Sequence, residues 1–69
     1  MEIYIIRITT IDNLYCDYMV EAGTLIGAVE KAKMAFLRDY PDADRNIQFS
    51  LRNPNMKKIK EILISFKKM

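Results

Sequence analysis

The first third of the chain alternates between apolar and polar residues, which indicates two strands joined by a tight turn. Isoleucine, tyrosine and threonine dominate residues 2–11, and such side chains favour the pleated surface of a sheet. Both faces of this segment are apolar near its start, which predicts a central position in the sheet. Asp12-Asn13 marks the turn, and a second strand is expected over residues 14–21. The core face of this second strand is expected to carry Leu14, Cys16, Tyr18 and Val20.

The pattern changes to a helical period in residues 25–39. Apolar side chains recur there at spacings of three and four, which predicts one amphipathic helix. Thr24 is placed to cap the N-terminus of this helix, and Pro41 to end it. Gly27 costs the helix about 1 kcal/mol relative to alanine, and close packing of the helix on the sheet is the expected reason. The apolar stripe consists of Leu25, Ala28, Val29, Ala32, Phe36 and Tyr40.

The last third of the chain begins with a clear strand and continues with a segment that fits two structures. Residues 45–52 alternate cleanly, which predicts a third strand with one face toward solvent. The apolar face of that strand carries Ile47, Phe49 and Leu51. In residues 53–69, Asn53-Pro54 would start a helix well. The isoleucines and the phenylalanine of residues 59–66 nevertheless favour a fourth strand after a turn, with the helix as the alternative.

These elements predict an α+β fold with the order ββαββ, or ββαβα if the C-terminal segment is helical. One amphipathic helix would cover one face of a small antiparallel sheet and form a two-layer domain. The chain has 69 residues, and a second core would need about 50 more. We therefore expect a single domain over residues 1–69.

Composition narrows the class of protein further. Apolar residues make up 51% of the chain and the net charge is only +2, which argues against disorder. No apolar run approaches the roughly 20 residues of a transmembrane helix. No signal peptide is visible either, so we expect a cytoplasmic protein. The ten isoleucines and seven lysines indicate an AT-rich coding sequence, as in many bacteria and their phages.

Residues that could carry out catalysis are scarce. The chain has no histidine, which is the usual acid–base group near neutral pH. Cys16, the only cysteine, has no histidine to activate it and is expected in the core. We interpret Asp39, Asp42 and Asp44 as part of a solvated loop rather than as a cation site. With no glycine-rich phosphate loop either, the sequence predicts no enzymatic activity, no cofactor, no metal and no small-molecule substrate.

Charge is divided unevenly along the chain. Residues 1–44 hold four basic and eight acidic side chains, a net charge of −4. Residues 45–69 hold seven basic and one acidic, a net charge of +6. A basic segment of this kind suggests contact with a polyanion, so nucleic-acid binding is the alternative function. The candidate phosphate contacts are Arg52, Lys57, Lys58, Lys60, Lys67 and Lys68.

Protein binding is the function that the sequence favours, for a self-associating regulator or inhibitor that acts as a homodimer or on another protein. A domain this small needs support, and a single cysteine excludes an internal disulfide, so self-association remains. Because the first strand is apolar on both faces, the face opposite the helix would stay exposed for a partner. The candidate interface residues are Tyr4, Ile6, Ile8, Tyr15 and Met19.

Overall fold

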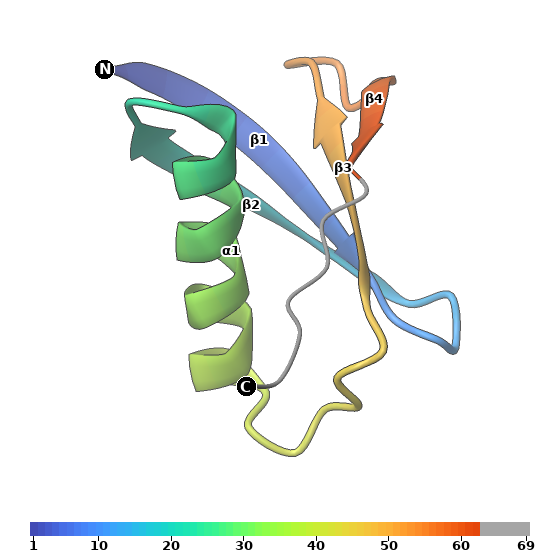
Figure 1. Cartoon of the computed structure of the whole chain (residues 1–69). Helices are drawn as coiled ribbons and strands as arrows, with labels where there is room; N and C mark the ends of the chain where they lie inside the picture. The colour runs from blue at the N-terminus through green and yellow to red at the C-terminus, as the bar shows by residue number, and fades with distance from the viewer. Residues whose placement is uncertain (63–69) are drawn as a thin grey trace.

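The structure, a computed structural model, describes residues 1–62. It contains one antiparallel sheet and one helix, which lies on one face of the sheet (Figure 1). In chain order the elements are β1 (Glu2–Thr9), β2 (Tyr15–Ala22), α1 (Leu25–Asp39), β3 (Gln48–Arg52) and β4 (Lys58–Ile62). The sheet order is β2-β1-β3-β4, and every neighbouring pair is antiparallel. The predicted α+β class and the order ββαββ are confirmed. Residues 63–69, where the prediction of the last strand continued, lie outside the described residues.

β1 has the central position that its sequence predicted. It pairs with β2 on one side and with β3 on the other, so its apolar side chains have neighbours on both flanks. Ile6 and Ile8 are fully buried and face α1. The register places Tyr18 opposite Ile6 and Cys16 opposite Ile8, so that the even-numbered residues of both strands share the face that α1 covers.

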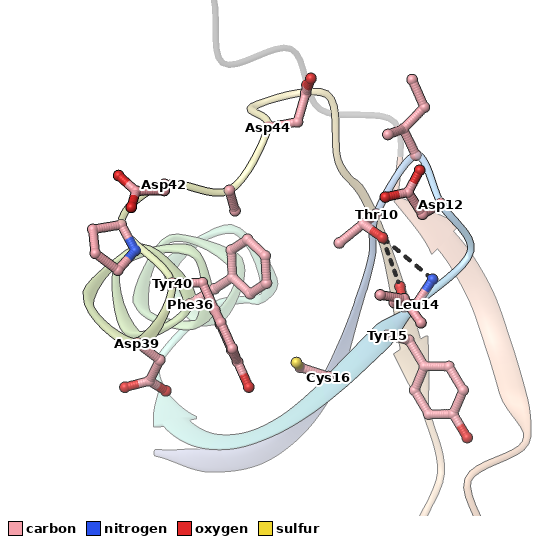
Figure 2. Close-up of a pocket in the computed structure, with 13 residues that line it drawn as sticks. Thr10, Asp12, Leu14, Tyr15, Cys16, Phe36, Asp39, Tyr40, Asp42 and Asp44 are labelled. Carbon is pink, nitrogen blue, oxygen red and sulfur yellow. Dashed lines mark hydrogen bonds between the residues drawn. The ribbon is translucent and has the colours of Figure 1, made fainter.

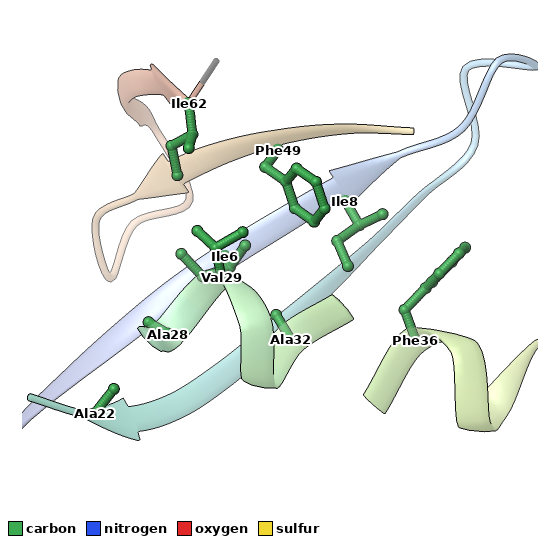
Figure 3. Close-up of a cluster of buried hydrophobic side chains, with 9 residues drawn as sticks. All are labelled: Ile6, Ile8, Ala22, Ala28, Val29, Ala32, Phe36, Phe49 and Ile62. Atoms are coloured by element: carbon green, nitrogen blue, oxygen red, sulfur yellow. The ribbon is translucent and has the colours of Figure 1, made fainter. Parts of the chain in front are cut away.

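The core lies between α1 and the face of the sheet that β1 and β2 present to it (Figure 3). Phe36 and Val29 of the helix pack there against Ile6 and Ile8 of β1. Within residues 1–62, the buried side chains of this cluster are Ile6, Ile8, Ala22, Ala28, Val29, Ala32, Phe36, Phe49 and Ile62. The predicted helix stripe is thus confirmed over most of its length, because Tyr40 alone among its members lies beyond the helix and is half exposed.

α1 begins and ends at the residues that the sequence marked. The Thr24 hydroxyl oxygen accepts a hydrogen bond from the Gly27 amide at 3.0 Å, which satisfies one of the free amides of the first turn. The helix ends at Asp39, two residues before Pro41. A Cβ atom on Gly27 would lie 3.1 Å from the Thr24 hydroxyl oxygen and 3.7 Å from Ala22 Cβ. The close neighbour of Gly27 is therefore the capping residue rather than the body of the sheet.

The two hairpins of the sheet use the same three-residue loop. In the β1–β2 turn, the Thr10 amide donates to the Leu14 carbonyl (2.8 Å) and the Asn13 amide to the Thr10 carbonyl (3.0 Å). Residues 53–57 of the β3–β4 turn repeat both hydrogen bonds. Asn13 and Met56 occupy the same place in the two loops, with φ of 66° and 67°. This left-handed conformation suits asparagine but is unfavourable for methionine.

β3 starts three residues later than its alternation predicted. The Asn46 amide donates to the Asp44 side chain at 2.7 Å, and this local turn competes with strand pairing. Residues 45–47 therefore belong to the connection that follows α1. In residues 1–62 no helix is both long enough and apolar enough to cross a membrane.

Candidate functional site

A groove of about 670 Å³ opens at one end of the molecule. Three segments that are far apart in the sequence form it (Figure 2): the β1–β2 turn with the start of β2, the end of α1, and the loop after α1. The lining residues are Thr10, Ile11, Asp12, Leu14, Tyr15, Cys16, Phe36, Asp39, Tyr40, Pro41, Asp42, Ala43 and Asp44. This volume is within the range of about 300–1,000 Å³ that is usual for binding pockets.

The floor of the groove is apolar. The Phe36 ring belongs to the core and points into the groove (Figure 2). It contacts the ring of Tyr40, with ring centroids 5.4 Å apart and planes tilted by 42°. Leu14, on the opposite side, is 67% exposed. A partner that covers Leu14 and Tyr40 would therefore remove apolar surface from water, which favours association.

The rim of the groove is acidic. Among the described residues that line it, the charged ones are all aspartates: Asp12 from the β1–β2 turn, and Asp39, Asp42 and Asp44 from the helix end and the loop. Figure 2 shows Asp12 on the far side of the opening from Asp39 and Asp42. The carboxylates thus surround the apolar floor and make this end of the molecule attractive to cations.

The four carboxylates differ in how strongly the fold engages them. Asp39 accepts a hydrogen bond from the Tyr18 hydroxyl at 3.1 Å and lies 3.6 Å from the Arg38 guanidinium. Asp44 accepts from the Asn46 amide, as described above. The ion pairs of residues 1–62 include neither Asp12 nor Asp42. Among the four rim carboxylates, Asp12 and Asp42 are therefore the ones best placed to pair with a cation of a partner.

Two tyrosines tie the groove to β2. Burial, together with the hydrogen bond to the Asp39 carboxylate, raises the pKa of Tyr18 to about 12. The interaction of the Tyr40 hydroxyl with the Cys16 thiol raises the pKa of Tyr40. Both phenols therefore stay neutral well above neutral pH. In the part of the chain that the structure describes, no three or more histidine, cysteine, aspartate or glutamate side chains are grouped closely enough to hold a metal ion.

The candidate interface that the sequence suggested is divided between two faces of the sheet. Ile6 and Ile8 are fully buried under α1, and Tyr4 packs against the same core. Tyr15 and Met19 lie on the other face, with exposures of 57% and 69%. Placing Tyr4, Ile6 and Ile8 on the face opposite the helix was therefore wrong.

This wrong assignment of the β1 face comes from the length of the turn, which has one residue more than predicted. A two-residue turn at Asp12-Asn13 would place residue 11 opposite residue 14, whereas the structure places Thr10 opposite Leu14 across a three-residue loop. A shift of one residue moves every side chain of a strand to the other face. Leu14, also expected in the core, precedes the first residue of β2 and is exposed at the groove.

Tyr15 contributes less to the groove than to the face of the sheet opposite α1, which we call the open face. Its ring points away from the groove (Figure 2) and lies against the Arg7 guanidinium, 3.9 Å from the ring centroid. Arg7 also makes two hydrogen bonds with the Asp17 carboxylate, at 2.7 and 3.0 Å. This network occupies the middle of the open face and leaves it less apolar than the sequence suggested.

Of the residues proposed for nucleic-acid contact, Arg52 and Lys58 lie opposite each other on β3 and β4. Arg52 donates to the Ser50 hydroxyl oxygen and to the Met56 carbonyl. Lys58 pairs with Glu61 at 2.7 Å. Lys60 lies opposite Leu51, on the side of the sheet that α1 covers, and Lys57 is exposed in the turn. Lys67 and Lys68 lie outside the described residues, so nucleic-acid binding stays a prediction.

The sequence predicted the segments that form the groove but not that they lie together. It singled out Asp12-Asn13 as a turn and Asp39, Asp42 and Asp44 as a loop after the helix, while Leu14 and Tyr40 were assigned to the core. The signal that could have joined them is the hairpin itself, because it returns the chain to the end of β1 where the helix later finishes. Comparisons with protein-family models, with curated proteins and with solved structures find no match to this chain.

Proposed function

We propose that this protein is a small interaction module that binds a basic segment of a partner protein in its acidic groove. The observation that carries the proposal is the composition of the groove within residues 1–62: its charged lining residues there are aspartates, and they surround an apolar floor. Protein binding without catalysis is also the function that the sequence favoured. The proposed contact lies at the end of the molecule, however, and not on the open face of the sheet.

Lysine and arginine side chains fit both parts of such a groove. Their aliphatic stems bury against apolar surface while the charged heads stay in water. On this protein the stem would lie over Phe36 and Tyr40, and the head would reach the carboxylates of Asp12 or Asp42. The Tyr40 ring, half exposed, adds a face on which a cation can rest. An apolar residue next to the basic one would cover Leu14.

The test is binding of a labelled hexapeptide in which lysine alternates with leucine and phenylalanine. We expect it to bind to the full chain, and we expect a matched peptide with glutamate for lysine not to bind. The variant Asp12→Asn with Asp42→Asn should weaken binding roughly 2- to 30-fold, since an exposed ion pair contributes about 0.2–1 kcal/mol. The affinity should also fall as salt is added. Fluorescence anisotropy measures all of these effects.

Two controls separate the groove from a general charge effect. The variant Glu2→Gln with Glu30→Gln removes the same number of negative charges outside the groove lining and should leave the affinity unchanged. Leu14→Ser alters an exposed residue of the floor and should weaken binding without unfolding the protein. Equal losses in both double variants, or no loss in any variant, would contradict the proposal.

A further inference from the structure

β2 is an edge strand, and its outer side has no strand partner within residues 1–62. At eight residues it is as long as the central strand. Free N–H and C=O groups along such an edge are a template for pairing with another strand. We propose that a second copy of this chain pairs antiparallel with β2, so that two four-stranded sheets join across a two-fold axis. The interface includes Tyr15 and Cys16, which also line the groove, but the pairing does not depend on the proposed function.

The free backbone groups of β2 belong to its odd-numbered residues. Across the turn, the Thr10 amide donates to the Leu14 carbonyl, and this register makes the even-numbered residues of β2 the hydrogen-bonded partners of β1. The Glu21 carbonyl accepts from the Lys31 side chain of α1 and so points away from β1. Both observations assign the outward groups to Tyr15, Asp17, Met19 and Glu21.

Overlap and charge together select one register for the pair. Outward residues of one copy must oppose outward residues of the other. A pair centred on Asp17 would oppose two Asp17 carboxylates, and a pair centred on Met19 would oppose Asp17 to Glu21; like charges directly opposite are destabilising. A pair centred on Tyr18 opposes Asp17 to Met19 and Tyr15 to Glu21. This register engages residues 15–21 of both copies without opposing like charges.

The partner at this edge must be another extended strand, and β2 of a second copy fits it in the register centred on Tyr18. Met19 and Tyr15 are exposed on the open face of β2, so pairing would cover part of both. A 69-residue domain has a thin margin of stability, and self-association is one of the usual ways to increase it. Edge pairing would supply that support without using the core.

Lys31 works against the pairing at one end of the edge. Its ammonium group occupies the Glu21 carbonyl, which in the dimer would accept from the Tyr15 amide of the second copy. A lysine at an edge is a common protection against strand pairing. The contact uses the Glu21 carbonyl and does not involve the backbone groups of Asp17 or Met19, which would still pair with the second copy. We therefore expect Lys31→Ala to lower the dimer dissociation constant.

A disulfide can test the register directly. In the pair centred on Tyr18, Cys16 of one copy lies opposite Val20 of the other, with Cα atoms about 4.5 Å apart and within disulfide range. Within one chain the two positions are four residues apart along a strand, about 13 Å, which is too far for a bond. The Val20→Cys variant should form covalent dimers on mild oxidation, with residue 16 joined to residue 20 in mass spectrometry.

Matched controls make this result specific. The double variant Val20→Cys with Cys16→Ser should form no such link, because the residue opposite the new thiol then has no sulfur atom. Covalent dimers joined through two residues 20, or equal dimer formation in the double variant, would overturn the register. Wild-type chain that remains monomeric at its highest soluble concentration, with Lys31→Ala also monomeric by light scattering, would overturn the dimer itself.

A proline variant tests the edge without relying on cysteine chemistry. The Met19 amide points outward, so Met19→Pro removes a donor to the second copy while the hydrogen bonds to β1 remain. We expect Met19→Pro to be a folded monomer and Met19→Ala, which keeps the amide, to remain a dimer. Far-ultraviolet circular dichroism verifies the fold, and sedimentation gives the mass. A folded Met19→Pro variant with the mass of a dimer would contradict pairing along this edge.

Discussion

At the scale of single residues, the burial of a side chain depends on which face of its strand it occupies rather than on its type. Ile6 and Ile8 are fully buried, whereas Ile3 of the same strand is 60% exposed. Met19 is as apolar as many core residues, but it lies on the face of the sheet opposite α1. These differences give substitutions with unequal expected effects on stability.

The contrast between Ile6 and Met19 is measurable. Ile6→Val removes one methyl group from the core and should reduce the free energy of unfolding by about 0.5–1.5 kcal/mol. Met19→Ala should change it by less than about 0.5 kcal/mol, as exposed substitutions usually do. Urea titration followed by circular dichroism gives both values. A larger loss for Met19→Ala than for Ile6→Val would mean that the two faces are exchanged. Because urea also opposes association, both variants should be compared at one low protein concentration.

At the scale of elements, the N-terminus of α1 couples two residues. Thr24 caps the helix through its hydroxyl oxygen, and the same atom stands 3.1 Å from the place where a Gly27 Cβ would be. A glycine in a helix costs stability, but here an alanine would press on the cap. The first turn of the helix therefore combines a residue of low helix propensity, Gly27, with a favourable N-cap, Thr24.

A double-mutant cycle should reveal this coupling. Thr24→Ala should reduce the free energy of unfolding by about 1 kcal/mol, because a helix amide loses its acceptor. Gly27→Ala in the Thr24→Ala background should recover up to about 1 kcal/mol through helix propensity. In the wild-type background the gain should be smaller, since the new Cβ and the hydroxyl oxygen compete for space. Equal gains in both backgrounds would show that the cap yields freely.

At the scale of the whole molecule, the contact between Tyr18 and Asp39 fastens the end of the helix to β2. The hydrogen bond joins residues 21 positions apart in the chain, next to the acidic groove. Burial and this bond raise the pKa of Tyr18 to about 12. The folded state therefore favours the neutral phenol more than the unfolded chain does, for which the pKa is about 10.

This linkage predicts a pH dependence at alkaline pH. The contribution of neutral Tyr18 is fully present below about pH 10 and is lost as the pH rises toward 12. We expect Tyr18→Phe to be less stable than wild type by about 0.5–1.5 kcal/mol at neutral pH. The difference should shrink as the pH rises through that window. Urea titrations across the window measure it, with the exposed Tyr15→Phe as control. A difference that stays constant with pH would contradict the linkage.

The sequence by itself determined the elements and their order. Alternation and helical spacing depend on local geometry, so β1, β2, α1 and β3 could be predicted from residue types, and Thr24 and Pro41 marked the limits of the helix. The central place of β1 also followed, because a strand with two apolar faces needs neighbours on both sides. The division of charge between the two parts of the chain is a property of the sequence alone.

Only the tertiary structure decided which face of β1 meets the helix. Tyr4, Ile6 and Ile8 form one apolar face, and Ile3 and Ile5 start the other, so the pattern allows either. The three-residue loop at Asn13 settled the choice, because it sets the register with β2. The groove also depends on tertiary structure, since Asp12 and Asp42 are 30 residues apart and meet only where the hairpin and the helix end at the same edge. Local pattern fixes the elements, whereas register and chain reversal fix what they bring together.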